Sequence, residues 1–171
     1  MKNYILLTIC FLFISSCENP NSVQVDSADW SGTISASDER NTIMNSFADA
    51  YANQDNEKAL SIFADDAVFY VNDTKLTPQD VVNAFATGHE YFDDIQHVES
   101  NTTTMFYNNG EIFTNYWYTW NGTNKKTGEL LELRGYAWFK WDGLKVVEAY
   151  NAFDPTAVSY THLRAHETVA N

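Results

Sequence analysis

The residues of this chain that could transfer protons are a pair of neighbouring aspartates and two histidines that each have a glutamate nearby. Asp65 and Asp66 are adjacent, and paired carboxylates can take different pKa values and do acid–base chemistry. They lie, however, where a predicted helix ends and a predicted strand begins. Aspartates at such places usually accept hydrogen bonds from nearby backbone N–H groups. We therefore expect a structural role for this pair.

The histidines give a weaker indication of chemistry. His97 and Glu99 stand two residues apart, which places them on one face of a strand and would allow a metal or acid–base pair. We expect instead that they lie on a solvated strand face. His89 follows Gly88 near a predicted helix end, where a protonated imidazole suits the helix dipole. Neither histidine belongs to a set of three plausible ligands, so the sequence predicts no metal site and no cofactor.

Both cysteines lie in the first seventeen residues, which resemble a bacterial lipoprotein signal. A lysine at position 2 precedes an apolar run at residues 4–14, and Ser15 and Ser16 precede Cys17. The run is shorter than the roughly 20 apolar residues of a spanning helix. The resemblance implies that Cys17 is acylated and anchors the protein to a membrane of the bacterial cell envelope, on its periplasmic or surface side. The alternative is an ordinary free cysteine.

Charge and aromatic content narrow the classes of partner. The formal net charge of −13 repels nucleic-acid phosphate, so we expect no nucleic-acid partner. Aromatic residues make up 15% of the chain, with five Trp, ten Tyr and eleven Phe. Such a content predicts an aromatic core, a ring-lined pocket, or both.

Composition divides the chain into four segments. We expect a signal peptide at residues 1–16, a polar tether at 17–36 and one globular domain at 37–156. Residues 157–171 carry no stripe of apolar residues that a helix or strand could bury, and we expect this tail to be non-native or disordered.

Periodicity within the domain predicts helices first and strands afterwards. Apolar residues four apart predict a helix ending near residue 52, a short helix follows at 59–63, and a Thr-Pro start with a Gly stop predicts a third at 77–88. Residues 67–71 are β-branched and aromatic, which predicts a strand between the second and third helices. From residue 95 onward, strands alternate with turns at 108–110, 121–128 and 142–143. This order predicts an α+β fold with three N-terminal helices.

The stretch Phe63-Ala64-Asp65-Asp66-Ala67-Val68-Phe69, in this order of elements, resembles the NTF2-like superfamily, specifically its SnoaL-like members. The resemblance covers about residues 38–155. It implies a cone, in which a curved mixed or largely antiparallel sheet wraps around the helices and leaves a pocket at its open end. The same fold hosts isomerases, dehydratases, cyclases, epoxide hydrolases and binding proteins, so it does not fix the function.

Ketosteroid isomerases are relatives whose chemistry can be compared position by position. Their carboxylate base and two oxyanion donors align with Val71, Phe47 and Ala137. Hydrocarbon side chains cannot exchange protons, so the isomerase reaction is excluded in this register. A shift by one residue would offer Tyr70, Asn72 or Tyr136 at these places, but no carboxylate.

Strand alternation, in the register that the resemblance implies, defines the concave face of the sheet. We expect a mostly apolar pocket with polar points at Tyr116, Tyr118 and Asn151, suited to a small apolar or aromatic molecule. The alternative is a filled core without a cavity. The predicted pocket residues are Phe47, Phe69, Val71, Phe85, Tyr116, Tyr118, Trp120, Leu133, Ala137, Val147 and Asn151.

The convex face carries Trp117, Tyr136 and Trp138 among charged residues. Exposed rings suggest a partner surface, and the resemblance implies a homodimer through this face. The alternative is cross-strand ring pairing within a lone sheet.

The functional hypothesis is therefore a membrane-anchored domain that binds a small apolar or aromatic molecule. The lack of a predicted pocket carboxylate weighs against catalysis. A SnoaL-like enzyme of hydratase, cyclase or hydrolase type is the second hypothesis, and a scaffold for another envelope protein is the third.

Overall fold

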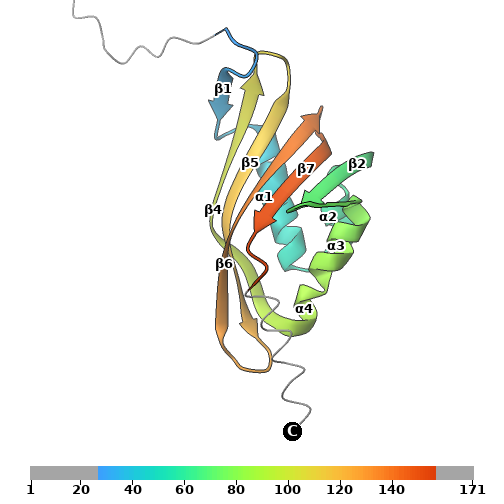
Figure 1. Cartoon of the computed structure of the whole chain (residues 1–171), viewed down its shortest axis with the longest axis vertical. Coiled ribbons are helices and arrows are strands. Elements are labelled where there is room, and N and C mark those ends of the chain that lie inside the picture. Colours follow the sequence, from blue (N-terminus) through green and yellow to red (C-terminus); the bar gives the residue numbers. More distant parts are fainter. Residues whose placement is uncertain (1–26, 157–171) are drawn as a thin grey trace, which may run out of the picture.

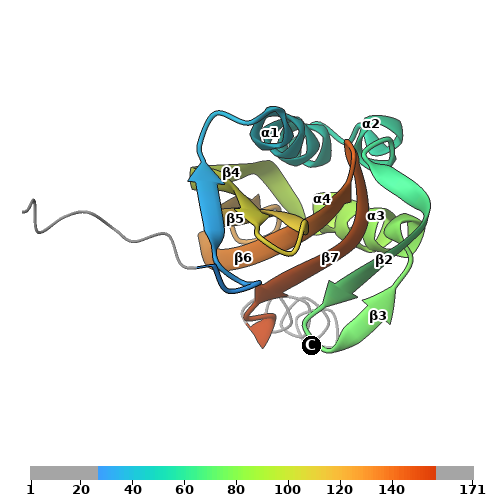
Figure 2. The ribbon, with the colours of Figure 1, turned by 90° about the horizontal axis from the view of Figure 1, so that it is seen from above.

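A computed structural model describes residues 27–156 as a curved seven-stranded sheet with helices on its concave side (Figures 1 and 2). The strands follow the order β1-β4-β5-β6-β7-β2-β3, in which only the β2–β7 pair is parallel among the described strands. The elements are β1 (Gly32–Ser35), α1 (Glu39–Ala52), α2 (Asn56–Leu60), β2 (Phe63–Val71), β3 (Thr74–Leu76), α3 (Pro78–Ala86), α4 (Gly88–Tyr91), β4 (Phe92–Tyr107), β5 (Ile112–Asn124), β6 (Leu130–Asp142) and β7 (Lys145–Phe153).

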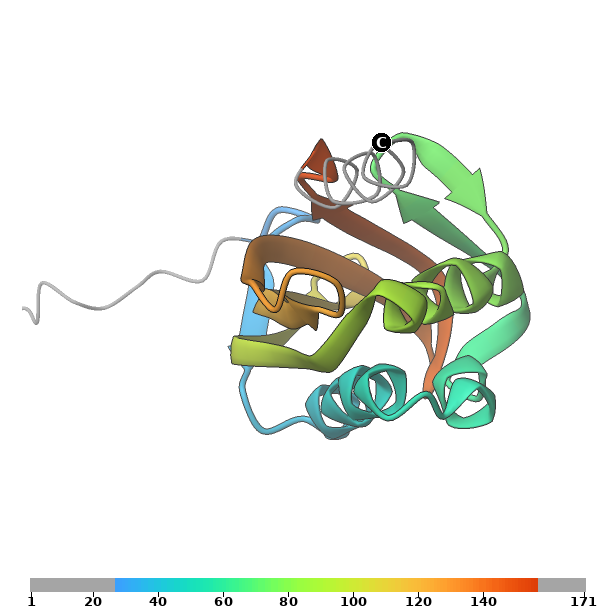
Figure 3. The same ribbon diagram turned by 90° about the horizontal axis from the view of Figure 1, so that it is seen from below.

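The predicted α+β fold class is confirmed. The chain contains both helices and strands, and the strands form one curved sheet around the helices. Figure 3 shows α1 and α3 lying across the hollow of the sheet, with α4 leading directly into β4. Long antiparallel strands with a right-handed twist curve in this way, and the helices fill the concavity. The arrangement packs α1 against β4 and β5, and α3 against β2.

The helix starts follow from local capping. The side chain of Asp38 accepts a hydrogen bond from the backbone N–H of Arg40 at the start of α1. Thr77 and Asp80 form a reciprocal capping box at the start of α3, with Pro78 in the first turn. These side chains satisfy N–H groups that have no partner inside the helix, and the predicted start of the third helix is confirmed.

Four local differences separate the structure from the sequence prediction. Gly32–Ser35, assigned to the tether, forms β1 and pairs with β4. Phe63, assigned to the second helix, begins β2. Gly88, expected to stop the third helix, opens α4 instead. The turn expected at residues 121–128 is shorter, since β5 continues to Asn124.

The predicted signal peptide, Cys17 and the tail at 157–171 lie outside the described residues. Within residues 27–156, none of the helices has the length and apolar character needed to cross a membrane.

A buried polar chain attaches α1 to the sheet. The Thr104 hydroxyl donates to Asn41 Oδ1 at 2.8 Å and lies 2.8 Å from the Thr114 hydroxyl, which accepts from Trp141 Nε1 at 2.9 Å. Asn41 Nδ2 in turn donates to the Ser35 carbonyl. Buried polar groups are tolerated when each has a partner, so this chain fixes the position of α1 relative to β4, β5 and β6.

Candidate functional site

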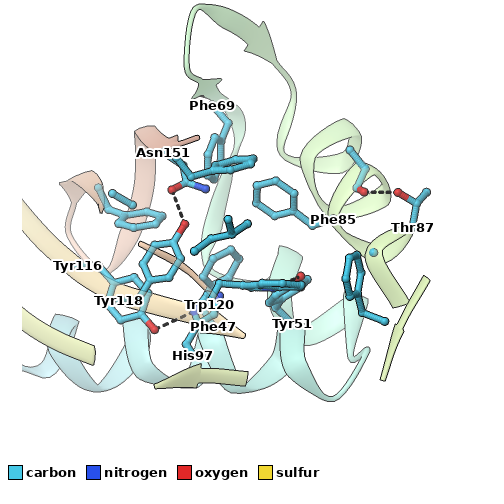
Figure 4. Close-up of a pocket in the computed structure, with 17 residues that line it drawn as sticks. Phe47, Tyr51, Phe69, Phe85, Thr87, His97, Tyr116, Tyr118, Trp120 and Asn151 are labelled. Carbon is cyan, nitrogen blue, oxygen red and sulfur yellow. Dashed lines mark hydrogen bonds between the residues drawn. The ribbon is translucent and has the colours of Figure 1, made fainter. Parts of the chain in front are cut away.

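A cavity of about 200 Å³ lies between α1, α3 and the concave face of the sheet. Figure 4 shows aromatic rings on several of its sides, with few polar atoms among them. The lining residues are Phe47 and Tyr51 from α1, Ala84 and Phe85 from α3, Thr87, Gly88, Phe69, Phe92, His97, Tyr116, Tyr118, Trp120, Leu133, Ala137, Phe139, Asn151 and Phe153. The cavity exists, so the alternative of a completely filled core is wrong.

The structure brings together nine of the predicted pocket residues. They come from α1, α3 and the four strands β2, β5, β6 and β7, and they converge because alternate side chains of a curved sheet point into its hollow. The nine are Phe47, Phe69, Phe85, Tyr116, Tyr118, Trp120, Leu133, Ala137 and Asn151.

Two predicted pocket residues do not line the cavity. Strand β7 has a bulge at Val147, because Lys140 of β6 pairs with Glu148 and Trp141 pairs with Val146. Val146 is fully buried in place of Val147. A bulge adds one residue and so reverses the alternation on one side of it. Val71 packs against the core, at the end of β2, without reaching the cavity.

Tyr51 and His97 are pocket residues that the sequence prediction left out. Tyr51 follows Phe47 by four residues on α1, so the helical stripe contained the signal for it. Its hydroxyl accepts a hydrogen bond from Trp120 Nε1 at 2.9 Å. Burial raises the pKa of Tyr51, although the Trp120 hydrogen bond opposes the rise.

His97 was predicted to share a solvated face with Glu99, and that prediction is wrong. A bulge lies between Val98 and Asn101 in the pairing of β4 with β5, and Glu99 takes a positive φ of 50° within it. This extra residue reverses the alternation, so His97 turns toward the cavity while Glu99 stays exposed. No pattern of residue types in the chain marks this bulge.

The imidazole of His97 is held by two tyrosines. Its Nδ1 lies 2.9 Å from the Tyr116 hydroxyl, and its ring stacks on Tyr118 with centroids 4.3 Å apart (Figure 4). Burial lowers the pKa of His97 to about 4. The imidazole is therefore neutral at pH 7, with a proton on one ring nitrogen and a lone pair on the other.

A second polar pair lies deeper on the sheet. The Tyr118 hydroxyl donates to Asn151 Oδ1 at 2.8 Å. Burial raises the pKa of Tyr118 to about 12, while the Asn151 contact lowers it and Tyr51 raises it. With Oδ1 engaged, the Asn151 Nδ2 group makes no hydrogen bond with any described residue and remains available as a donor.

The two adjacent aspartates do not reach this site. Asp65 and Asp66 are exposed and lie in the irregular part of β2, between Phe63 and Val68. Phe47 and Ala137 stand at two of the positions where ketosteroid isomerases have catalytic groups. Both residues line the cavity with hydrocarbon side chains. The cavity lining contains no carboxylate, lysine or arginine among the residues that the structure describes.

Within residues 27–156, the structure contains no group of three His, Cys, Asp or Glu side chains placed to hold a metal ion. The predicted absence of a cofactor is not tested by the structure.

Comparison with known proteins identifies the fold through structure alone. No family model matches this chain, and no curated protein sequence matches it. Among solved structures, IdmH, a candidate polyketide cyclase from Streptomyces antibioticus, is similar with a TM-score of 0.60 and 13% identity, over 72% of this chain and 98% of IdmH. AclR, a candidate hydroxylase from Streptomyces galilaeus, gives a TM-score of 0.55 and 18% identity over 68% of this chain and 90% of AclR.

A SnoaL-like candidate polyketide cyclase from Shewanella denitrificans gives a TM-score of 0.50 and 17% identity, over 73% of this chain and 97% of that protein. Identities this low establish a shared fold and leave the reaction open. The chain therefore has the NTF2-like fold of the SnoaL-like polyketide cyclases.

Proposed function

We propose that this protein binds a small, uncharged aromatic molecule in the cavity between α1, α3 and the sheet. The observation that supports this proposal is a ring-lined cavity of about 200 Å³ without a charged side chain in its described lining. A dry apolar cavity of roughly 150 Å³ accepts benzene, so this one suits one ring or two fused rings. A carboxylate or ammonium ligand would lose its hydration here without gaining a counter-ion.

A few polar atoms would orient such a ligand. Asn151 Nδ2 can donate a hydrogen bond, and the Tyr51 hydroxyl keeps its own proton to donate while it accepts from Trp120. Ligand pockets commonly combine an apolar lining with a small number of such groups. A single oxygen on the ring system would satisfy them.

The test is thermal unfolding of the protein with naphthalene-sized compounds, using 2-naphthol and 2-naphthoate as a neutral and a charged probe. A ligand that binds only the folded state raises the melting temperature by mass action. We expect stabilisation by 2-naphthol and none by 2-naphthoate. Leu133→Trp places a larger side chain at the cavity wall and should abolish the shift, with its own melting curve as the control for folding. Equal shifts for both probes, or none for either, would contradict the proposal.

A SnoaL-like enzyme of cyclase type is the second candidate function. It is favoured by His97, a neutral base at the cavity wall, and by the candidate polyketide cyclases that share the fold. A general base works best when its pKa lies near the working pH, so His97, with a pKa of about 4, is unprotonated at pH 7 but a weak base. Loss of deuterium from α-deuterated 2-indanone would measure such a reaction, and His97→Gln should reduce it to the rate in buffer. A rate in the unmodified protein equal to that in buffer would refute catalysis of this type.

We further propose that acylated Cys17 anchors the protein to the cell envelope. The sequence of residues 1–17 supports this proposal, because several acyl chains together hold a protein firmly on a membrane. Cys17→Ser should move the protein from the membrane fraction to the soluble fraction. Unchanged pelleting with membranes would remove the anchor.

The convex face of the sheet supports a proposal of self-association. Trp117 pairs with Tyr136, and Trp138 stacks on Tyr150, yet Trp117 remains 44% exposed. Cross-strand pairing accounts for part of this ring surface, and a second copy would cover the rest. Sedimentation of the domain should show a dimer that Trp117→Lys converts to a monomer. A monomer before substitution would refute the proposal.

A further inference from the structure

A second hollow, a polar groove of about 490 Å³, lies between α1 and β4. Its volume is within the roughly 300–1,000 Å³ that ligand sites usually occupy. His97 and Tyr116 lie between the groove and the aromatic cavity, since these two residues line both hollows. The remaining lining of the groove is Asn45, Ala48, Asp49, Ala52, Asn53, Ile95, Gln96, Ser100 and Thr102.

Side-chain hydrogen bonds join α1 to β4 on one side of this groove. Figure 2 shows α1 beside β4, where the Thr104 hydroxyl donates to Asn41 Oδ1 at 2.8 Å and the Thr102 hydroxyl donates to Asn45 Oδ1 at 3.2 Å. Side chains four residues apart share one face of a helix. Asp49 therefore follows Asn41 and Asn45 on the same face of α1, and it lines the groove.

This series of hydrogen bonds ends at Asp49, where β4 has a bulge. The extra residue lies between Val98 and Asn101, and Glu99 adopts a left-handed φ of 50°. Non-glycine residues in this conformation carry strain and are concentrated at functional sites. The Asp49 carboxylate makes no hydrogen bond or ion pair with any residue that the structure describes. The groove is thus the place where polar side chains of the helix face the strand without a partner on it.

The groove offers both acceptors and donors to a ligand. The Asp49 carboxylate can only accept, and Asn53, whose Nδ2 donates to the Asp49 carbonyl at 2.8 Å, keeps Oδ1 as a second acceptor. Asn45 accepts from Thr102 through Oδ1, so the N–H groups of its Nδ2 remain free to donate.

This mixture of donors and acceptors selects among classes of polar ligand. An ammonium group could donate to Asp49 but could not accept from Asn45. A phosphate or carboxylate would be repelled by Asp49 and by the formal net charge of −13. Hydroxyl groups both donate and accept, so a molecule with several neighbouring hydroxyls matches the groove best.

The floor of the groove suits the carbon skeleton of such a molecule. Ala48, Ile95 and Tyr116 line it and are buried. The small side chains of Ala48 and Ala52 leave room between helix and strand. A pyranose ring has an apolar C–H face beside its hydroxyl edge, and that face can pack against an aliphatic and aromatic floor.

We propose that the groove between α1 and β4 binds a neutral sugar, with the hydroxyls of one pyranose ring hydrogen-bonded to Asp49, Asn45 and Asn53. This site lies outside the aromatic cavity, so the proposal goes beyond the proposed function and does not depend on it. Affinity should depend most on Asp49, because hydrogen bonds to an ionised group are stronger than those between neutral groups.

The experiment is a titration of the protein with glucose, galactose, mannose and xylose, followed in ¹H–¹⁵N NMR spectra. We expect at least one of these sugars to bind with a dissociation constant on the order of 1 mM. The largest shifts should fall on backbone amides that border the groove, such as those of Asp49, Asn53 and Ser100.

Three variants locate the binding groups. Asp49→Ala should weaken the affinity about tenfold, as expected for a lost hydrogen bond to a charged group, and alanine is compatible with the helix. Asn45→Ala should weaken it about fivefold. Glu132→Ala removes an exposed carboxylate outside the groove lining and is the matched control, which should leave the affinity unchanged. If Asp49→Ala fails to fold, Asp49→Asn, which keeps the shape of the side chain, should also weaken binding.

The outcomes separate this proposal from its alternatives and from the binding function of the cavity. The absence of binding by all four sugars, an undiminished affinity in the Asp49 variants, or shifts confined to the aromatic cavity would each overturn it. Tighter binding of methylammonium than of every sugar would also overturn it, in favour of a cation site. If a sugar binds as expected but 2-naphthol does not, the function proposed for the cavity is wrong and the sugar site stands.

Discussion

Acidification should destabilise the protein through His97 at pH values where most carboxylates are still ionised. In the unfolded chain this imidazole takes up a proton near pH 6.5, whereas burial in the folded state lowers its pKa to about 4. The unfolded state therefore binds more protons between these values, and its population rises as the pH falls. From pH 7 to pH 4.5, His97 should remove about 2 kcal/mol from the free energy of unfolding.

The assay is denaturant unfolding of the protein and of His97→Gln at pH 7, 5.5 and 4.5. Carboxylates contribute equally to both proteins, and the tyrosines around His97, namely Tyr51, Tyr116 and Tyr118, stay protonated throughout. The difference in unfolding free energy between the two proteins isolates His97, and it should shrink by about 2 kcal/mol on acidification. His89→Gln is the matched control, because His89 lies outside the cavity lining. An unchanged difference between pH 7 and pH 4.5 would refute the burial of a neutral imidazole.

Three further predictions concern the packing that shapes the cavity. Gly135→Ala should destabilise the fold and abolish ligand binding, since the added Cβ would lie 2.2 Å from Cζ of Tyr118; an unaltered melting temperature would contradict this contact. Asn151→Leu leaves the buried Tyr118 hydroxyl without its acceptor and should lower the free energy of unfolding, measured with denaturant, by about 1–3 kcal/mol. The loss of the Asn151 contact should also move the spectrophotometric titration of Tyr118 to higher pH. Thr104→Val breaks the polar chain between α1 and the sheet and should cost a similar 1–3 kcal/mol, whereas an equally stable variant would show that this chain does not hold α1.

The sequence predicted most elements because their signals are local. Thr77, Pro78 and Asp80 specify the start of α3 through interactions within four residues. The turn at residues 108–110 likewise joins β4 to β5, with Gly110 at a φ of 89° donating to the Tyr107 carbonyl. Strand β1 was not predicted, since Gly32–Ser35 carries no alternation of its own and is a strand only because β4 offers it an edge.

Alternation along the strands also predicted much of the cavity lining. The inward positions of β5 and β6, from Tyr116 to Ala137, were correct because their pairing is regular from Ile112 to Thr123. Regular pairing lets the period of two propagate from one known position to the next. The lining of these strands was therefore determined by the sequence once the fold was given.

The tertiary structure alone decided that His97 joins the predicted polar residues of the site. Whether His97 or its neighbours face the cavity depends on the bulge around Glu99, and whether Val146 or Val147 is buried depends on the bulge opposite Lys140. A bulge is a mismatch between two strands, so neither strand encodes it by itself. Residue types and spacing thus determined an aromatic hollow in this protein, and the pairing of strands decided that the hollow contains a neutral histidine.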